Sequence, residues 1–247
     1  MLPNFLHIGA AKCASSWLWR CLKQHPQVYV PDSPDNVNFF TVHYHRGLDW
    51  YERTYFAAHR NEPAVGEFSN SYMCHHPALQ RIARDLPDAR LTMTLRNPVV
   101  RAYLSWAHIH LKRGKYGLDP EAGIGIPFEK VLHHHGHAFF RLWIEPGFYA
   151  WHLTRIQQLF PRERVLVTLY DDLAADNAGY LRRYFSFLGV DADVEIGLVG
   201  EDVNPDAESA DPAKALDAEF RAELREVYAE DIAALEGMLD RDLSHWR

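Results

Sequence analysis

The sequence predicts an α/β fold in which a central parallel β-sheet is flanked by helices on both faces. Short apolar runs rich in strand formers alternate along the chain with longer segments whose apolar residues recur at helical spacing. One of these runs, 90–95, is apolar enough to be a buried parallel strand, and another, 164–170, is the clearest strand in the chain. No internal repeat, low-complexity segment or break in composition divides the 247 residues, so we expect one domain over residues 1–247.

The first expected strand is Phe5 to Ile8, which runs through small residues into a helix that begins near Ser15. A short extended piece follows at 27–30, after the turn at His25-Pro26. The remaining expected strands, in chain order, cover 64–68, 90–95 and 164–170. Each of them is short and bounded by turn formers or by a helical segment, as the strands of a parallel sheet are.

Apolar residues at helical spacing mark the expected helices. Pro77 lies in the first turn of one helix and Pro87 ends it, while Arg96-Asn97-Pro98 forms the turn before another. After the helix near Ser15, the expected helices cover 47–58, 77–86, 99–112, 127–140, 147–160, 176–188 and 213–239. The segments 32–38, 114–125 and 199–212 are rich in turn formers and are expected to be loops.

The composition is typical of a soluble globular protein. A formal net charge of −7 argues against general binding to nucleic acid or anionic membranes, so an anionic ligand must be bound by a local cluster of donors. Cys13, Cys21 and Cys74 show no metal-ligand spacing and are expected to be reduced thiols. No apolar run is long enough to span a bilayer, and the first strand begins too early for a signal peptide, which favours a cytoplasmic protein.

The stretch from Phe5 to Arg20 predicts an anion-binding loop. A strand that passes through small residues into a helix directs several backbone N–H groups at one spot, where the helix dipole favours a phosphate or sulfate. Lys12 adds a positive charge, and Ser15 or Ser16 is placed to cap the helix. The stretch is not the usual nucleotide P-loop, because Lys12 precedes the serines and Ala14 stands where a glycine is expected. The alternative is a connection whose small residues serve packing alone.

Polar side chains follow four of the expected strands, at the sheet edge where ligands of parallel sheets bind. Lys12 follows the first strand, and Arg96 follows the strand 90–95. Two cations at the ends of two strands suit a ligand with two separate anionic groups, such as a bisphosphorylated nucleotide. The other two strand ends carry Glu67 with Ser69, and Tyr170 with Asp171.

Several sequence blocks occur in the order in which one known family carries them. Lys12-Cys-Ala-Ser-Ser-Trp-Leu18 and Leu95-Arg-Asn-Pro-Val-Val-Arg-Ala-Tyr103 are similar to the 5′-phosphosulfate loop and the 3′-phosphate motif of the sulfotransferases that use 3′-phosphoadenosine 5′-phosphosulfate (PAPS). The other matching blocks include His25-Pro26, Phe39-Phe40, Gly66-Glu-Phe-Ser-Asn-Ser-Tyr72, Asp171-Asp-Leu173 and the ending from Leu239 to Trp246. The resemblance covers most of the chain and implies the P-loop-NTPase-like fold of that family.

The resemblance implies transfer of the sulfuryl group of PAPS to a hydroxyl or amine of a carbohydrate, lipid or small-molecule acceptor, with release of 3′-phosphoadenosine 5′-phosphate. It implies that Arg96 binds the 3′-phosphate, because a guanidinium contacts two oxygens at once. In-line transfer requires that the negative charge of the leaving phosphate be neutralised. The resemblance implies that Lys12 is the catalytic residue that does so, and that no metal is required. The loop residues implied to bind the 5′ end are Lys12, Cys13, Ala14, Ser15, Ser16 and Trp17.

Three departures from the family pattern concern the bound nucleotide. Ala14 replaces the family's glycine, which requires either an ordinary backbone conformation or a slightly different loop. Leu104 occupies the position of the 3′-phosphate serine, and Ser105 stands one position later, about 100° round a helix. We therefore keep Ser105 as a candidate contact. The late basic loop that often covers the nucleotide is not evident, because 199–212 contains no Lys or Arg.

The general base must differ from that of many relatives, because Asp35 and Asn36 replace the family's Lys-Glu pair and an amide cannot accept the proton. Glu67, at a strand end inside a matching block, is the first candidate. The alternative for Glu67 is a structural carboxylate that pairs with an Arg or Lys. His43 and His45 follow the aromatic pair, where an acceptor could approach, and are the next candidates; Asp35 is a further one.

The remaining features have structural interpretations. Arg101 is expected to be an ion-pair partner on a helix face, with a supporting role near the cofactor as the alternative. The apolar stripe of the last helix is either core packing or the face of a homodimer. Two alternative functions are a nucleotide-binding protein of the same fold without transfer activity, and a P-loop kinase-like enzyme. The histidines expected to form surface clusters rather than a metal site, because no Cys or carboxylate lies at zinc-like spacing, are His108, His110, His133, His134, His135 and His137.

Overall fold

The computed structural model describes residues 1–32, 36–111, 128–132, 140–200 and 216–247. Contacts between Cα atoms divide the chain into two compact units. The first unit consists of Met1–Leu95 and Thr154–Pro205, and the second of Arg96–Leu153 and Asp206–Arg247. The loop expected at 114–125, Asp35 and most of the histidine cluster lie outside the described residues.

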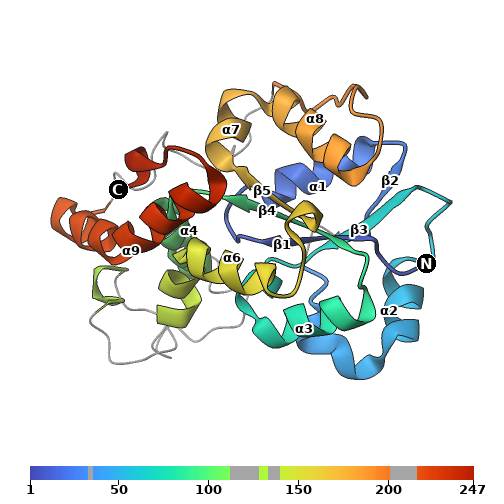
Figure 1. The fold of residues 1–247 in the computed structure, drawn as a ribbon, viewed down its shortest axis with the longest axis horizontal. Helices are drawn as coiled ribbons and strands as arrows, with labels where there is room; N and C mark the ends of the chain where they lie inside the picture. The colour runs from blue at the N-terminus through green and yellow to red at the C-terminus, as the bar shows by residue number, and fades with distance from the viewer. Residues whose placement is uncertain (33–35, 112–127, 133–139, 201–215) are drawn as a thin grey trace. The chain divides into compact units, whose positions relative to one another are not determined.

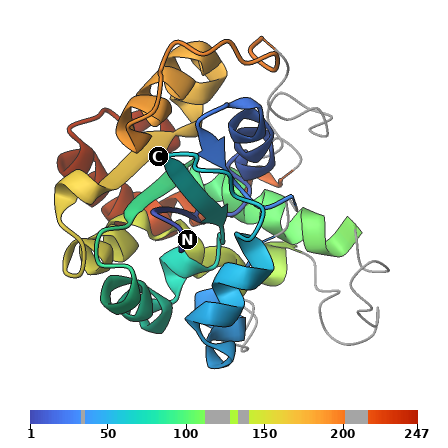
Figure 2. The same ribbon diagram turned by 90° about the vertical axis from the view of Figure 1, so that its right-hand side faces the viewer.

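A parallel sheet forms the centre of the first unit. Its order is β2-β3-β1-β4-β5, and the helices of this unit surround it in Figure 2. The predicted fold class is therefore confirmed. Because the chain runs from β1 to β2 and β3 on one side and then to β4 on the other, the strand order reverses between β1 and β4, where ligands of such sheets bind. The five strands of the described chain are β1 (Phe5–Gly9), β2 (Val28–Tyr29), β3 (Ala64–Phe68), β4 (Arg90–Leu95) and β5 (Val165–Leu169).

Helices cover both faces of this sheet. In Figure 1, α1 (Ser15–Gln24) and α8 (Asn177–Leu188) lie on one face and α3 (His76–Asp85) on the other. The other helices of the unit are α2 (Leu48–Tyr55) and α7 (Tyr170–Ala175). The predicted apolar stripe of α1 is buried in a core shared with α8, and its members are Trp17, Leu18, Cys21 and Leu22.

Hydroxyl groups dock α8 onto β4. Tyr184 and Tyr180, one helical turn apart, form hydrogen bonds with Thr92 at 2.6 Å and with Thr94 at 2.7 Å. His7 on β1 joins this ladder through Nδ1, 3.2 Å from the Thr92 hydroxyl. Burial lowers the pKa of His7 to about 3, so this imidazole is neutral in the folded protein. The hydroxyl groups are therefore paired with one another and fix the helix on the sheet, whereas the buried Nε2 of His7 has no hydrogen-bond partner in the described structure.

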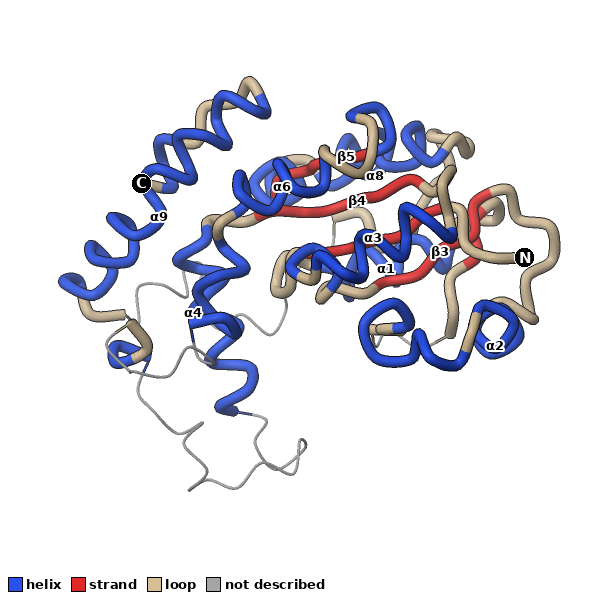
Figure 3. The backbone as a smooth tube through the Cα atoms, turned by 60° about the horizontal axis from the view of Figure 1, so that its bottom comes forward, coloured by secondary structure: helices blue, strands red, loops and turns tan. Residues whose placement is uncertain are grey.

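The second unit contains α4 (Pro98–Leu111), α9 (Ala218–Leu239) and the start of α6 (Tyr149–Gln157), which are visible in Figure 3. The Tyr228 hydroxyl donates to the Ile144 carbonyl at 2.9 Å. Asp231 accepts from two backbone N–H groups at the start of α6, both at 3.0 Å, and so caps that helix. The residues of α9 that are buried are Phe220, Leu224, Tyr228, Ile232 and Leu235, which confirms core packing of this stripe.

Some expected helices differ from the observed ones. No α-helix occupies the described residues of 127–140: Val131 N–H donates to the Phe128 carbonyl at 3.0 Å, which closes a 3₁₀ turn because that bond spans three residues. The last helix begins at Ala218 rather than 213, and Asp217 caps it. Short 3₁₀ or π turns cover Phe39–His43, Tyr44–Arg46, Tyr72–Cys74, Phe128–Lys130, Phe140–Ile144, Glu145–Gly147, Arg162–Arg164 and Ser244–Trp246.

Candidate active site

The loop between β1 and α1 has the backbone conformation of an anion-binding loop. Lys12 and Ala14 both adopt left-handed conformations, with φ of 69° and 67°. Alternating left-handed residues turn successive N–H groups toward one side of a loop, which forms a concavity for anions. Ala14 thus takes the conformation that a glycine favours, and the expectation of an ordinary conformation at this position is wrong. An L-residue pays about 1–2 kcal/mol for it.

The serines of the loop do not cap α1. The N-cap is Ala14, whose side chain cannot accept a hydrogen bond, and α1 begins at Ser15. The predicted capping role of Ser15 or Ser16 is therefore wrong, since both lie inside the first turn. The first intrahelical bond runs from Leu18 N–H to the Ala14 carbonyl at 3.0 Å. The N–H groups of residues 15–17 have no intrahelical acceptor, so they are available to a ligand.

The side chains of the loop divide into two groups. Lys12 and Ser15 are half-buried and Ser16 is exposed. Cys13 and Trp17 are 1% and 2% exposed, and they pack in the core. Of these two residues, only the backbone can contact a ligand, whereas Lys12, Ser15 and Ser16 can also offer side-chain donors.

Glu67, at the end of β3, is completely buried among hydroxyl groups. Its Oε1 accepts from Tyr51 and Tyr72, both at 2.9 Å, and its Oε2 accepts from Ser69 at 2.6 Å. Burial raises the pKa of Glu67 to about 7, although the three hydroxyl donors favour the carboxylate and lower it. In the described chain Glu67 has no Arg or Lys partner, so the alternative interpretation of an ion pair does not hold, and these hydroxyls take its place.

The partners of Glu67 fix the segment that carries the family's base position. The Ser69 hydroxyl accepts from Asn38 N–H at 2.8 Å, and the Tyr72 hydroxyl accepts from Phe40 N–H at 3.0 Å. Both hydroxyls also donate to Glu67, so the carboxylate fixes this segment indirectly, through Ser69 and Tyr72. A general base must touch its substrate. Because Glu67 has no exposed surface, it is better suited to positioning its neighbours.

Asn36, which is predicted to occupy that base position, is hydrogen-bonded to the turn after β3. Its Oδ1 accepts from the Asn70 N–H at 2.8 Å. Because a backbone N–H can only donate, the Asn36 oxygen faces Asn70 and its NH₂ group points away. The Asn70 side chain in turn donates to Ser15 Oγ at 3.3 Å. Asn70 is not among the predicted site residues; its place in the polar run after β3 is the only signal for it in the sequence.

His43 lies at the end of the π turn that begins with the aromatic pair. Its ring is half-buried and centred 5.6 Å from the ring of Trp50. The Arg46 guanidinium lies over the same indole, 4.8 Å from its centroid, and His45 is exposed. The structure therefore places His43 beside an aromatic and cationic surface, and gives it no described hydrogen bond to Glu67.

In the second unit, Arg96 directly follows β4 and precedes the cap of α4. Arg96 is 8% exposed, and its carbonyl accepts from the Tyr149 hydroxyl at 2.8 Å. The Asn97 Oδ1 accepts from Val99 N–H at 3.0 Å, and Pro98 occupies the first turn. The predicted turn is thus confirmed as an Asn cap followed by Pro, and it fixes the backbone at Arg96.

Arg101 and Ser105 lie one turn apart on α4, and both are buried. The Arg101 guanidinium donates to the Trp143 carbonyl. Within the described residues Arg101 has no carboxylate partner, so the expectation of an ion pair on a helix face is wrong: the side chain is fully buried and acts in the interior of its unit. The structure shows no described hydrogen bond of the Ser105 hydroxyl.

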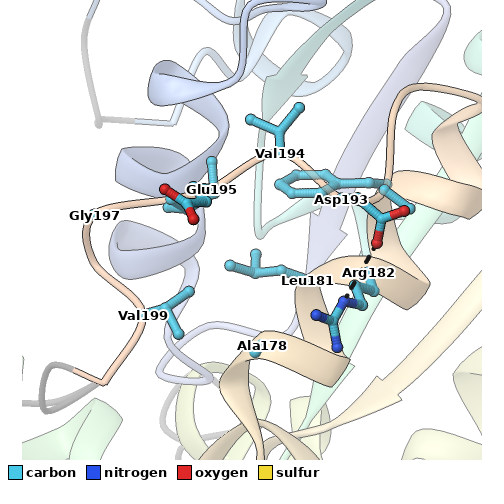
Figure 4. A pocket seen from close by; sticks show the side chains of 11 residues that line it. Ala178, Leu181, Arg182, Asp193, Val194, Glu195, Gly197 and Val199 are labelled. Carbon is cyan, nitrogen blue, oxygen red and sulfur yellow. Dashed lines mark ion pairs between the residues drawn. The ribbon is translucent and has the colours of Figure 1, made fainter.

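A separate hollow of about 500 Å³ lies against α8 and contains none of the predicted site residues. Figure 4 shows its apolar lining, including Leu181, and the ion pair between Arg182 and Asp193, 3.7 Å long. The described chain contains no helix long and apolar enough to cross a membrane. It also contains no group of three or more His, Cys, Asp or Glu side chains arranged to hold a metal ion.

The chain is similar to known proteins over most of its length. The family model described as "Sulfotransferase domain" matches residues 2–210. A crystal structure of a sulfotransferase from Alicyclobacillus acidocaldarius is 31% identical, with a TM-score of 0.78 over 100% of this chain and 99% of that one. The sulfotransferase domain of the Synechococcus olefin synthase, 14% identical with a TM-score of 0.52, shares the fold.

Curated relatives are longer than this chain. Human heparan sulfate glucosamine 3-O-sulfotransferase 6 is 30% identical over 192 residues, which cover 76% of this chain and 52% of that protein. Human bifunctional heparan sulfate N-deacetylase/N-sulfotransferase 3 is 31% identical over 202 residues, covering 76% of this chain and 22% of that protein. The chain spans about half or less of the length of these relatives.

Proposed function

This chain belongs to the sulfotransferase family, and on that premise we propose that it transfers the sulfuryl group of PAPS to a hydroxyl or amine. The observation that carries the proposal is the loop between β1 and α1. Its left-handed residues and the open N–H groups at the start of α1 suit an anion, and Lys12 adds a positive charge to the same loop.

In this proposal Lys12 and the N–H groups of residues 15–17 bind the 5′-phosphosulfate. During transfer the bond between sulfur and the bridging phosphate oxygen breaks while the acceptor forms its own bond to sulfur, so negative charge grows on the leaving phosphate. Lys12 and the N-terminus of α1 neutralise that charge. Arg96 is proposed to bind the 3′-phosphate, supported by its place in the matching motif and by the capped turn that fixes its backbone.

The acceptor must lose a proton as it attacks. Apart from Lys12, two side chains are predicted to be catalytic: His43 is partly exposed, and Glu67 is completely buried. We therefore propose that His43 is the general base that accepts the proton of the acceptor. Glu67 has a positioning role and acts through Ser69 and Tyr72. Ser105 stays a candidate contact of the nucleotide.

A carbohydrate is the acceptor class we propose, ahead of a lipid or another small molecule. The support is that the curated relatives are named for heparan sulfate. The exposed side of Trp50, with Arg46 over its ring, suits a sugar because aromatic faces pack against C–H groups and guanidinium groups bind anionic substituents.

Calorimetric titration with 3′-phosphoadenosine 5′-phosphate tests the donor site, with ATP and Mg²⁺ as the control ligand. Micromolar or tighter binding of the bisphosphate that is lost in Arg96→Ala supports the proposal. Transfer of labelled sulfate from PAPS to an oligosaccharide then tests the activity. Binding of the bisphosphate without transfer to any acceptor class would favour a nucleotide-binding protein without transfer activity, and preference for ATP with Mg²⁺ a kinase-like enzyme.

A further inference from the structure

Asn70 lies in the turn after β3, directly beside the anion loop. The approach is close: a Cβ on Gly9 would lie 3.2 Å from the Asn70 carbonyl oxygen. The Asn70 side chain donates through Nδ2 to Ser15 Oγ at 3.3 Å. Its Oδ1 is buried and finds no hydrogen-bond partner in the described structure. A buried amide oxygen without a partner is rare, so the placement of this amide needs an explanation.

The bond from Asn70 determines where the Ser15 proton points. A serine hydroxyl has one proton and accepts through its lone pairs. Because Ser15 Oγ accepts from Asn70, its proton is turned away from Asn70, and no described residue accepts it. Ser15 is the first residue of α1, so this proton lies among the N–H groups that have no intrahelical acceptor.

We propose that Asn70 is a positioning residue of the sulfuryl-transfer site, which holds the Ser15 hydroxyl as a donor to the oxygens of the bound 5′-phosphosulfate. This inference rests on the proposed function. Asn70 does not touch the reacting atoms; it acts through Ser15. Its own backbone N–H turns the Asn36 amide in the same manner, with the NH₂ group outward.

Two replacements of similar size separate this role from simple packing. In Asn70→Leu the donor is lost without a new charge, and the Ser15 proton is no longer directed. In Asn70→Asp a hydrogen bond to Ser15 persists, but the carboxylate can only accept, so the Ser15 proton turns toward residue 70. Each variant is expected to weaken the binding of 3′-phosphoadenosine 5′-phosphate about tenfold in calorimetry, since a hydrogen bond to a charged group is lost.

A double-mutant cycle tests whether Asn70 acts through Ser15. Ser15→Ala removes the hydroxyl itself and is expected to weaken binding to the same extent as Asn70→Leu. In the Ser15→Ala background, Asn70→Leu should weaken binding no further, because the two changes remove one interaction. A residue that merely supports the fold would give additive losses, and Asn70→Asp would largely rescue it.

Ser71→Ala is the matched control, because Ser71 belongs to the same turn and its hydroxyl donates to Asn38 Oδ1 at 2.8 Å without contact to Ser15. This variant should bind the bisphosphate as the unmodified chain does, and melting temperatures verify that every variant is folded. Unchanged binding in Asn70→Leu, or additive losses in the cycle, would overturn the inference while the proposed function stands. An unmodified chain that binds no bisphosphate would overturn both.

Discussion

The replacement Glu67→Gln separates the two roles assigned to this carboxylate. Glutamine keeps the size of the side chain and one oxygen, which can still accept from Tyr51 and Tyr72. It cannot ionise, and its NH₂ group can donate to Ser69 if that hydroxyl rotates. The variant therefore removes a buried charge and leaves the hydrogen-bonded cluster largely intact.

The stability effect follows from the pKa of Glu67, which burial raises from 4.5 to about 7. Because the pKa is higher in the folded chain than in the unfolded one, the folded chain binds this proton more tightly. The contribution of Glu67 to stability is thus fully present below pH 4.5 and is lost as the pH rises to about 7. At about 1.4 kcal/mol per pKa unit, the loss amounts to about 3 kcal/mol.

Urea unfolding of the two proteins over this pH range measures the effect. The free energy of unfolding of Glu67→Gln, minus that of the unmodified chain, should rise by about 3 kcal/mol between pH 4.5 and about pH 7. The difference cancels the titration of all other groups that the two proteins share. A difference that does not change with pH would refute the buried, poorly solvated carboxylate described here.

The same variant tests the catalytic assignment. Loss of a general base costs about 10²–10⁴-fold in rate. A positioning residue whose hydrogen bonds are mostly kept should cost less than about tenfold in kcat at neutral pH. A folded Glu67→Gln enzyme with a hundredfold loss of kcat would restore Glu67 as the base. Tyr51→Phe is the companion control: it removes a donor to the carboxylate, so its destabilisation should grow, not shrink, as the pH rises.

Three further replacements test the proposed site. Lys12→Ala should lower kcat about 10²–10³-fold in turnover of labelled PAPS, because charge on the leaving phosphate is no longer neutralised; retained turnover would exclude the role. Arg96→Lys should weaken bisphosphate binding about tenfold in calorimetry, since an ammonium does not grip two oxygens; equal affinity would contradict it. His43→Gln should lower kcat about 10²–10⁴-fold in the same turnover assay, because the acceptor then lacks its proposed general base; an unaltered kcat would exclude His43 as the base.

The sheet and the anion loop could be predicted because their signals are local. Each strand is a short apolar run, and small residues around Lys12 indicate the turn from Gly9 to Ala14. The conformation of Ala14 could not be predicted, because an alanine gives no sign that the fold holds it at a φ of 67°. The prediction that Ser15 or Ser16 caps the helix was wrong for the same reason: Ala14 is the N-cap, so both serines lie inside the first turn of α1.

The roles of charged residues were harder to predict, because their partners are distant in sequence and uncharged. Glu67 was predicted to be the general base, with an ion pair to Arg or Lys as the alternative, yet it is satisfied by three hydroxyls, one of them 16 residues away on α2. Arg101 was expected on a helix face, yet it donates to a carbonyl 42 residues away. A carboxylate or guanidinium in the sequence does not indicate whether the fold will supply a charge, a hydroxyl or a carbonyl.

The turn after β3 connects both halves of the proposed chemistry. Through Ser69 and Tyr72 it holds the segment at Asn38 and Phe40, and through Asn70 it holds Ser15 in the anion loop. The exposed residue Asn36, at the predicted position of the family's base, turns its NH₂ group away from Asn70. Such an amide cannot take a proton but can stabilise oxygen charge. The acceptor must then lose its proton to another group, and for this reason we assign the role of general base to His43 rather than to Asn36.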